Sequence, residues 1–166
     1  MSHREPHPLS EGVPPVWACE YGEDRFGVYA VFEVKGVEQR VRWIRPGSFS
    51  MGSPAEDKER FDWEMDPHPV ALTEGFWIAE TPCTQELWHA VTGENPSQFS
   101  GPKRPVENVS WKDCARFFET LNQGVPGLNA KLPTEAQWEY MCRAGSTQSR
   151  HGELDEIAWY GENSGG

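Results

Sequence analysis

The sequence predicts one domain of short strands and short helices, rather than a helical bundle or a disordered chain. Its 166 residues suffice for a single hydrophobic core. Hydrophobic residues make up 37% of the chain and aromatic residues 12%, so large side chains are available to offset the entropy cost of folding. The 16 glycines and 14 prolines indicate many turns between the elements. We expect residues 1–16 to form a flexible leader and residues 17–166 to form the domain.

Alternating residues in the first half of the chain predict strands. Within residues 26–44, branched and aromatic residues alternate with polar ones on both sides of Lys35 and Gly36. This pattern is typical of a hairpin with a tight turn. A turn and a short strand around Phe49 should follow, and residues 70–80 are rich enough in aromatic and branched residues for one or two further strands.

Three short helices are predicted in the second half, over residues 84–93, 110–124 and 134–145. Each begins at a serine or threonine suited to N-capping and ends near a glycine. The spacing of Ser110 to Asp113 resembles a capping box, in which the two residues hold each other's backbone N–H groups. The third helix begins in the same manner, with threonine followed three positions later by glutamine.

Apolar residues at steps of three and four predict the buried faces of the last two helices. The face of the second helix carries Trp111, Cys114, Phe117, Phe118 and Leu121. The face of the third helix carries Trp138, Met141 and Cys142. We therefore expect Trp138 to lie in the core. Further along the chain, Ile157, Trp159 and Tyr160 predict a strand or a buried turn.

A charged stretch over residues 54–69 raises the question of a metal site. Its acidic residues are Glu56, Asp57, Glu59, Asp62, Glu64 and Asp66. Together with His68 they match neither the spacing of a calcium-binding EF-hand loop nor that of an HExxH zinc helix. We predict a solvated loop here, and no metal role for His68 or for the isolated His89.

The formal net charge of −11 argues against surfaces that bind nucleic acid or anionic membranes, because lysine and arginine must meet the phosphates there. The first residues contain no apolar segment typical of a secretory signal, and no window approaches the roughly 20 apolar residues of a membrane span. We therefore expect a soluble, cytoplasmic protein with no nucleic-acid partner and no membrane partner.

The four cysteines, Cys19, Cys83, Cys114 and Cys142, stand at long and uneven spacings without a CxxC pair. The favoured interpretation is reduced, buried thiols, with disulfides or a zinc site as alternatives. Cys83 precedes a predicted helix start, where the helix dipole can lower the pKa of a thiol. No histidine or second cysteine stands beside it in the sequence, so we predict no reactive role for it.

Four segments carry a resemblance to a known family, in the family's order and at its distances. They are "RWIRPGSFSMGS", "GFWIAETPCTQELW", "RPVENVSWKDCARFFETLN" and "LPTEAQWEYMCRAG". Together they resemble the formylglycine-generating enzyme, or sulfatase-modifying factor, family over about residues 41–160. The departures in these segments, or directly before one of them, are mild, with Lys131 in place of arginine, Gln137 of glutamate, Cys83 of valine and Cys114 of alanine.

The resemblance implies an α+β domain with a modified C-type-lectin-like fold, made of irregular strands and about three short helices. It also implies the activity of the family, which is the oxygen- and copper-dependent oxidation of a sulfatase cysteine to Cα-formylglycine by a pair of cysteines. Other members of the family form sulfoxides with iron, or are non-catalytic lectin-like modules that bind ligands.

The chain departs from the family's pattern in its second half, where the family carries a "GNxWEW" motif and the reactive cysteine pair. We therefore expect this chain to be the N-terminal portion of the domain, with a fold that is incomplete at the C-terminus. Cys83, Cys114 and Cys142 do not match the copper cysteines, and Cu(I) prefers two soft sulfur ligands. We predict no catalytic and no cofactor-binding residues here, with copper or calcium only when the missing half is supplied. Three loop residues that could offer oxygen ligands to a metal stay unassigned: Asp155, Asn163 and Ser164.

Two possible functions follow from the resemblance and from these departures. The first is that of a formylglycine-generating-enzyme-like domain that is inactive alone, because it lacks the catalytic cysteine half. The second is that of a non-catalytic lectin-like binding or scaffolding module that acts through a partner chain. Both imply a protein or peptide partner, either a complementing chain or a second copy of this chain, and we expect a surface at Trp159 and Tyr160 to pair with it.

Overall fold

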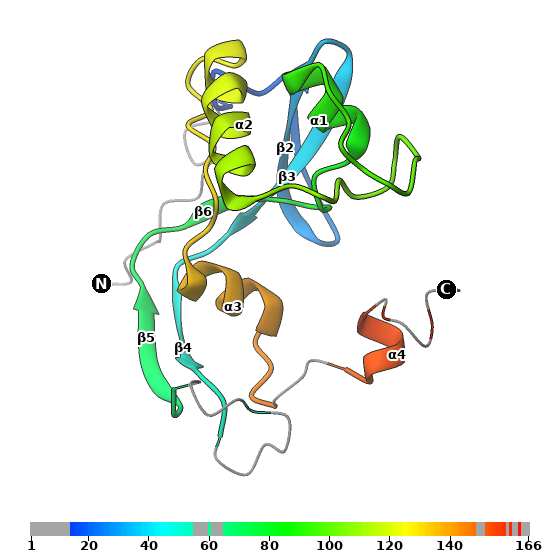
Figure 1. Cartoon of the computed structure of the whole chain (residues 1–166). Helices are drawn as coiled ribbons and strands as arrows, with labels where there is room; N and C mark the ends of the chain where they lie inside the picture. The colour runs from blue at the N-terminus through cyan, green and yellow to red at the C-terminus, as the bar shows by residue number, and fades with distance from the viewer. Residues whose placement is uncertain are drawn as a thin grey trace. The chain divides into compact units, whose positions relative to one another are not determined.

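The computed structural model of this chain describes residues 14–54, 60, 65–148, 152–158, 160 and 163. The chain divides into two compact units, each made of two segments (Figure 1). The first unit comprises Met1–Ile44 and Phe76–Leu132, and the second comprises Arg45–Gly75 and Pro133–Gly166. Most of the predicted leader lies outside the described residues, so its boundary stays a prediction.

The first unit contains a four-stranded antiparallel sheet with the order β1-β2-β3-β6. Its strands are β1 (Glu20–Asp24), β2 (Gly27–Val34), β3 (Val37–Ile44) and β6 (Phe76–Ala79). Lys35 and Gly36 join β2 to β3 with φ angles of 49° and 81°. Two positive φ angles are what a type I′ hairpin turn requires, so the predicted hairpin is confirmed. The sequence does not predict β1, because its polar stretch EYGED lacks apolar alternation.

Helix α1 (Gln85–Thr92) follows β6 and contacts β2, β3 and the second helix of this unit. The hydroxyl of Thr84 accepts a hydrogen bond from the backbone N–H of Leu87 at 3.3 Å, which caps the first turn. Gly93 ends the helix in the left-handed conformation, with a φ of 82°. The predicted start and stop of this helix are confirmed.

Helix α2 (Trp111–Gly124) begins with the predicted capping box between Ser110 and Asp113. The helix ends at Gly124, near the predicted position, but Val125 caps it with a φ of −127°, so no left-handed glycine stops it. The prediction that Trp111 is buried is also wrong, because its side chain is 72% exposed. Trp111 occupies the first helical position, one turn before the part of the helix that the core covers.

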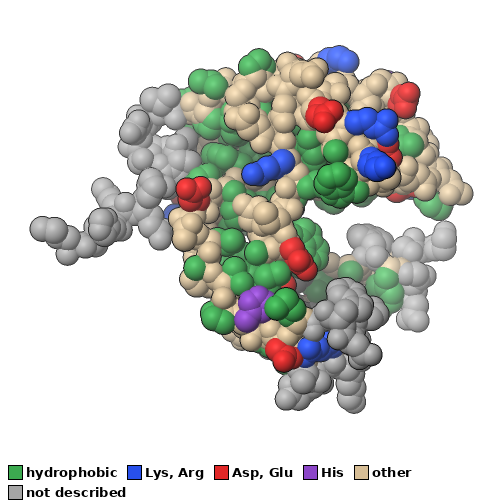
Figure 2. All heavy atoms as spheres, turned by 60° about the vertical axis from the view of Figure 1, so that its left-hand side comes forward, with side chains coloured by type: hydrophobic (Ala, Val, Ile, Leu, Met, Phe, Trp, Pro, Cys, Tyr) green, Lys and Arg blue, Asp and Glu red, His purple; other side chains and the backbone are tan. Residues whose placement is uncertain are grey.

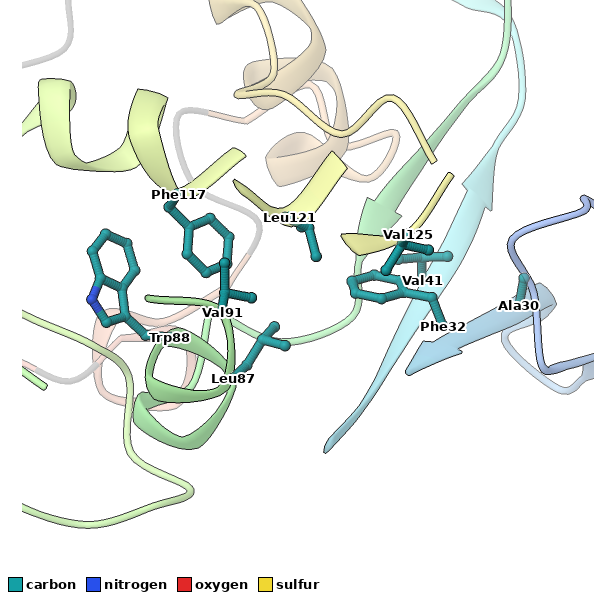
Figure 3. Close-up of a cluster of buried hydrophobic side chains, with 9 residues drawn as sticks. All are labelled: Ala30, Phe32, Val41, Leu87, Trp88, Val91, Phe117, Leu121 and Val125. Carbon is teal, nitrogen blue, oxygen red and sulfur yellow. The ribbon is translucent and has the colours of Figure 1, made fainter. Parts of the chain in front are cut away.

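The core of the first unit lies between the sheet and the two helices (Figure 3). Nine buried residues form one cluster: Ala30, Phe32, Val41, Leu87, Trp88, Val91, Phe117, Leu121 and Val125. The rings of Trp88 and Phe117 stack with centroids 4.8 Å apart and an interplanar angle of 7°, which joins α1 to α2. Burial of such rings supplies most of the favourable free energy of a small core.

The second unit contains a two-stranded antiparallel pair, β4 (Gly47–Met51) and β5 (His68–Leu72), and helix α3 (Glu135–Arg143). The rings of Phe49 and Tyr140 lie 5.3 Å apart and connect β4 to α3. Gly47 faces the hydroxyl of Tyr140 so closely that any Cβ at this position would collide with it. The predicted strand around Phe49 and the predicted third helix are confirmed.

Polar contacts fix the end of β4 to α3 in the second unit. The Glu139 carboxylate accepts a hydrogen bond from the backbone N–H of Gly52 at 2.9 Å. The Arg143 guanidinium donates to the Gly52 carbonyl oxygen at 2.8 Å and pairs with Glu139 at 2.7 Å. Both charged side chains are largely buried, with 16% and 20% exposure for Arg143 and Glu139. The ion pair therefore holds both backbone groups of Gly52.

Two further predictions about the second unit are corrected. Trp138 is 55% exposed and no residue of α3 is buried, so the predicted core stripe of this helix is wrong. The predicted strand or buried turn at Ile157 is a short helix instead, α4 (Leu154–Ile157), followed by the half-buried Tyr160. Trp159 lies outside the described residues, and so does most of the predicted charged loop, whose last two residues belong to β5.

Candidate functional site

A pocket of about 370 Å³ lies in the first unit, between the end of α1, the loop of residues 94–109 and the first half of α2. Its apolar lining comes from all three parts: Trp88, Val91, Pro96, Val109 and Phe117. The pocket is thus built on the stacked rings of the core, which fix its floor. Ligand pockets typically begin at about 300 Å³, so this volume suits a side chain or a small molecule.

Charged and polar groups surround this apolar floor. They are Thr92, Glu94, Asn108, Asp113, Arg116 and Thr120. Asp113 is held in place, because its Oδ1 accepts from Arg116 at 2.7 Å and its Oδ2 accepts from the backbone N–H of Ser110 at 2.9 Å. Hydrogen bonds from the Ser110 hydroxyl and backbone, with help from Arg116, lower the pKa of Asp113 below its ordinary value of 3.8. The carboxylate is therefore ionised at neutral pH.

One buried amide organises the loop that forms the outer wall of the pocket. Gln85 is only 2% exposed, and its Nε2 donates to the carbonyl oxygens of Phe99 at 2.9 Å and Pro105 at 3.2 Å. Its Oε1 accepts from Asn95 Nδ2 and from the backbone N–H of Gly101, both at 3.0 Å. All four hydrogen-bonding positions of the amide are used, as a buried polar group requires.

A second side chain braces the same loop. Oε1 of Glu107 accepts hydrogen bonds from the backbone N–H groups of Gln98 and Phe99. Asn108, the next residue and part of the pocket wall, has a φ of 60°, which is uncommon outside glycine. The loop therefore has a defined shape without forming a helix or a strand.

The four cysteine thiols differ in how far they are buried. Burial, with a smaller effect of Cys114, raises the pKa of Cys83 to about 12. Burial therefore disfavours the thiolate of Cys83, and the absence of a reactive role stays a prediction. Cys114 packs against the same core, Cys142 is half-buried in α3, and the exposed Cys19 donates from its Sγ to the Val31 carbonyl oxygen at 3.3 Å.

The candidate metal ligands are not brought together in the described part of the chain, which contains no group of three or more histidine, cysteine, aspartate or glutamate residues able to hold a metal ion. His68 contacts the Asp66 carbonyl oxygen through Nδ1 at 3.0 Å, and His89 is exposed in the last turn of α1. Asp155 accepts from the hydroxyl of Tyr160.

Asn163 makes two local hydrogen bonds, because its Nδ2 donates to the Ala158 carbonyl oxygen at 2.9 Å and its Oδ1 accepts from the Tyr160 N–H at 2.8 Å. Its amide is therefore already used in shaping the turn after α4. Ser164 lies outside the described residues.

The sequence does not reveal this pocket. Glu94, Asn108 and Arg116 stand in unrelated local contexts, and only the fold brings them to one place. The local signal that could have pointed here is the capping box at Ser110, because it places Asp113 at the start of α2. Among the described residues, every helix is too short or too polar to span a membrane.

Curated relatives match part of the chain. It is 31% identical to "Chaperone protein LppX" of Paenibacillus barcinonensis, over 54% of this chain and 45% of that protein. It is 30% identical to the formylglycine-generating enzyme of Thermomonospora curvata, over 57% of this chain and 32% of the enzyme. The chain thus spans less than half the length of these two relatives.

Solved structures share the fold. Treponema denticola variable protein 1 superposes with a TM-score of 0.68 and 29% identity, over 82% of this chain and 66% of that one. PvdO from Pseudomonas aeruginosa superposes with a TM-score of 0.65 and 23% identity, over 78% and 57%. These likenesses confirm the predicted C-type-lectin-like α+β fold.

A family model settles the assignment. Residues 28–165 match the "Sulfatase-modifying factor enzyme 1-like domain", which includes all four segments that carry the resemblance in the sequence. The chain belongs to the sulfatase-modifying factor, or formylglycine-generating enzyme, family.

Proposed function

We propose that this chain is a formylglycine-generating-enzyme-like domain that binds a protein or peptide and does not itself oxidise cysteine. The observation that carries the proposal is the raised pKa of Cys83, about 12, which keeps this thiol protonated at neutral pH. Copper(I) and nucleophilic chemistry both need thiolates. Burial of Cys83 therefore disfavours a role as nucleophile, and the described residues hold no group of three or more histidine, cysteine, aspartate or glutamate residues able to hold a metal ion.

Two features support a binding role. The pocket of the first unit combines an apolar floor with charged groups, the composition typical of ligand sites. Large hydrophobic side chains also reach the surface, and Figure 2 shows such side chains among charged ones. In the first unit these include Trp111 and Phe99, which are 72% and 59% exposed. Tryptophan and phenylalanine are enriched at protein interfaces.

The oxidation half of the proposal is tested with a cysteine peptide that carries a sulfatase motif, together with copper(I) and oxygen. The formylglycine-generating enzyme of Thermomonospora curvata serves as the positive control. We expect the 166-residue chain to give no thiol-to-aldehyde mass change, while the control enzyme converts the peptide. An aldehyde that this chain forms, and that Cys83→Ser abolishes, would overturn the proposal.

The family activity is the second candidate, and the family match over residues 28–165 favours it. In that case the chain contributes to cysteine oxidation only together with a complementing part that supplies the copper-binding cysteines. Mixing the chain with such a part should then convert the peptide, and the chain alone should not. Conversion by the mixture would make the chain part of an enzyme.

We also propose the cytoplasm as the location, in line with the free thiols. The partner is either a different protein or peptide, or a second copy of this chain. Light scattering distinguishes these cases. A stable, monodisperse monomer that binds no apolar dye would argue against self-association and would leave a different protein or peptide as the partner.

A further inference from the structure

We infer that the pocket between α1, the 94–109 loop and α2 binds a basic side chain, lysine or arginine, of a peptide or protein partner. The inference rests on the proposed binding function and names the chemistry of its ligand. Three observations carry it: the charge of the lining, the shape of its apolar part and the rigidity of the loop.

The charge of the lining favours a cation. The pocket has two carboxylates, Glu94 and Asp113, but a single guanidinium, that of Arg116. Asp113 is already engaged by Ser110 and Arg116. The described residues offer the Glu94 carboxylate no hydrogen bond and no ion pair, so it is free for a ligand. The net charge of −11 for the whole chain adds attraction for a basic partner.

The apolar lining matches the rest of a basic side chain. Lysine and arginine carry aliphatic stems that pack on hydrophobic surface while the charged end reaches a polar rim. Pro96, Val109 and Val91 would receive the stem, and Glu94 would receive the charged end. A volume of about 370 Å³ is at the small end for ligand pockets, which suits one side chain better than a nucleotide or an oligosaccharide.

An acidic ligand fits less well. Arg116 is the cation in the lining, and its side chain is 72% exposed and already pairs with Asp113. A carboxylate ligand would have to compete with Asp113 for this guanidinium and would face repulsion from Glu94. The same groups attract an ammonium or guanidinium.

The loop holds its part of the pocket in place before a ligand arrives. Gln85 fixes Asn95 beside Glu94 and Pro96, and it fixes the backbone at Phe99 and Gly101. Preorganised groups lose less entropy on binding, so even a small pocket can discriminate between ligands.

The test uses an acetylated alanine peptide with one central arginine, and the same peptide with citrulline, the neutral isostere. Binding is followed by amide chemical shifts of the 166-residue chain. We expect the arginine peptide to shift amides of the 94–109 loop and of α2 in a saturable way, and to bind more weakly at high salt. The citrulline peptide should bind about fivefold more weakly, which is the upper end of what an exposed ion pair contributes.

Two variants locate the effect. Glu94→Gln should lower the affinity for the arginine peptide by about fivefold. Glu38→Gln, at an exposed position of β3, should leave this affinity unchanged. Equal binding of both peptides, or unchanged affinity in Glu94→Gln, would overturn the inference. Such a result would not affect the proposal that the chain does not oxidise cysteine, because the peptide-conversion assay tests that proposal separately.

Discussion

Helices α2 and α3 begin in the same way and differ in burial. Each has a hydroxyl N-cap with a reciprocal partner three residues later, Asp113 in α2 and Gln137 in α3. Yet α2 buries Phe117 and Leu121 to 4% and 3% exposure, whereas no residue of α3 is buried. Capping depends on neighbours in the sequence, while burial depends on which distant elements cover the helix.

The helices are also held differently. The stacked Trp88 and Phe117 join α2 to α1, so the first unit depends on an apolar core. Helix α3 is held through the Glu139–Arg143 pair and the ring contact of Tyr140. Substitutions that remove one kind of contact should therefore destabilise one helix more than the other.

The largest effect is expected from Phe117→Ala. Loss of this ring removes the stack on Trp88 and leaves a cavity, which should lower the free energy of unfolding by ~3–5 kcal/mol. Urea denaturation followed by far-UV circular dichroism measures the change. A loss smaller than about 1 kcal/mol, typical of surface sites, would show that the core does not depend on this stack.

Arg143→Ala should have the next largest effect, because it leaves the Gly52 carbonyl oxygen and the Glu139 carboxylate without their main partner. We expect a loss of about 2–3 kcal/mol in the same denaturation experiment. Arg116→Ala is the matched control, since that arginine is exposed and its pair with Asp113 should contribute at most about 1 kcal/mol. Equal losses for the two variants would remove the distinction between buried and exposed pairs.

Trp138→Ala should cost less than either substitution. The ring is 55% exposed, so its removal should lower the free energy of unfolding by about 1 kcal/mol, as at a partly covered surface site. The same denaturation curve serves for the comparison with Phe117→Ala. A loss of about 3 kcal/mol or more would mean that Trp138 behaves as a core residue after all.

The smallest effect concerns pH and the two capping boxes. Asp113 has a lowered pKa in the folded chain, so its contribution to stability is present above its ordinary value of 3.8 and is lost as pH falls through the lower, folded pKa. Gln137 does not titrate. Acidification below about pH 4 should therefore loosen the first turn of α2 but not that of α3.

Amide chemical shifts of Ser110 and Thr134 report the two starts separately. Asp113→Asn should remove the pH response at Ser110 and leave Thr134 as it was. An equal response at both amides would indicate a general acid effect rather than titration of the capping box.

The elements that local signals specify could be predicted from the sequence. The hairpin turn at Lys35 and Gly36, the N-caps and the helix positions all depend on residues close together in the chain. The exposure of Trp111 and Trp138 could not be predicted, because helical periodicity shows which residues share a face but not whether another element covers it. A side chain can therefore belong to an apolar stripe and still meet solvent.

The site was less predictable than the fold. The environment of Cys83 depends on the core around it, and burial raises the pKa of this thiol, whereas its sequence position before a helix suggests a lowered one. The pocket joins residues from two helices and a loop, and Glu94 has no local motif that marks it. Only the packing of α1 on α2 brings these groups together.

Gln85 gives the loop after α1 a cooperative link to the helix itself. Because one side chain on the first turn of α1 accepts from the Gly101 N–H, that amide should exchange with deuterium only when α1 opens. The neighbouring loop would then share the lifetime of a helix without having helical hydrogen bonds. The side-chain amide of Gln85 thus couples the opening of this irregular loop to the opening of α1.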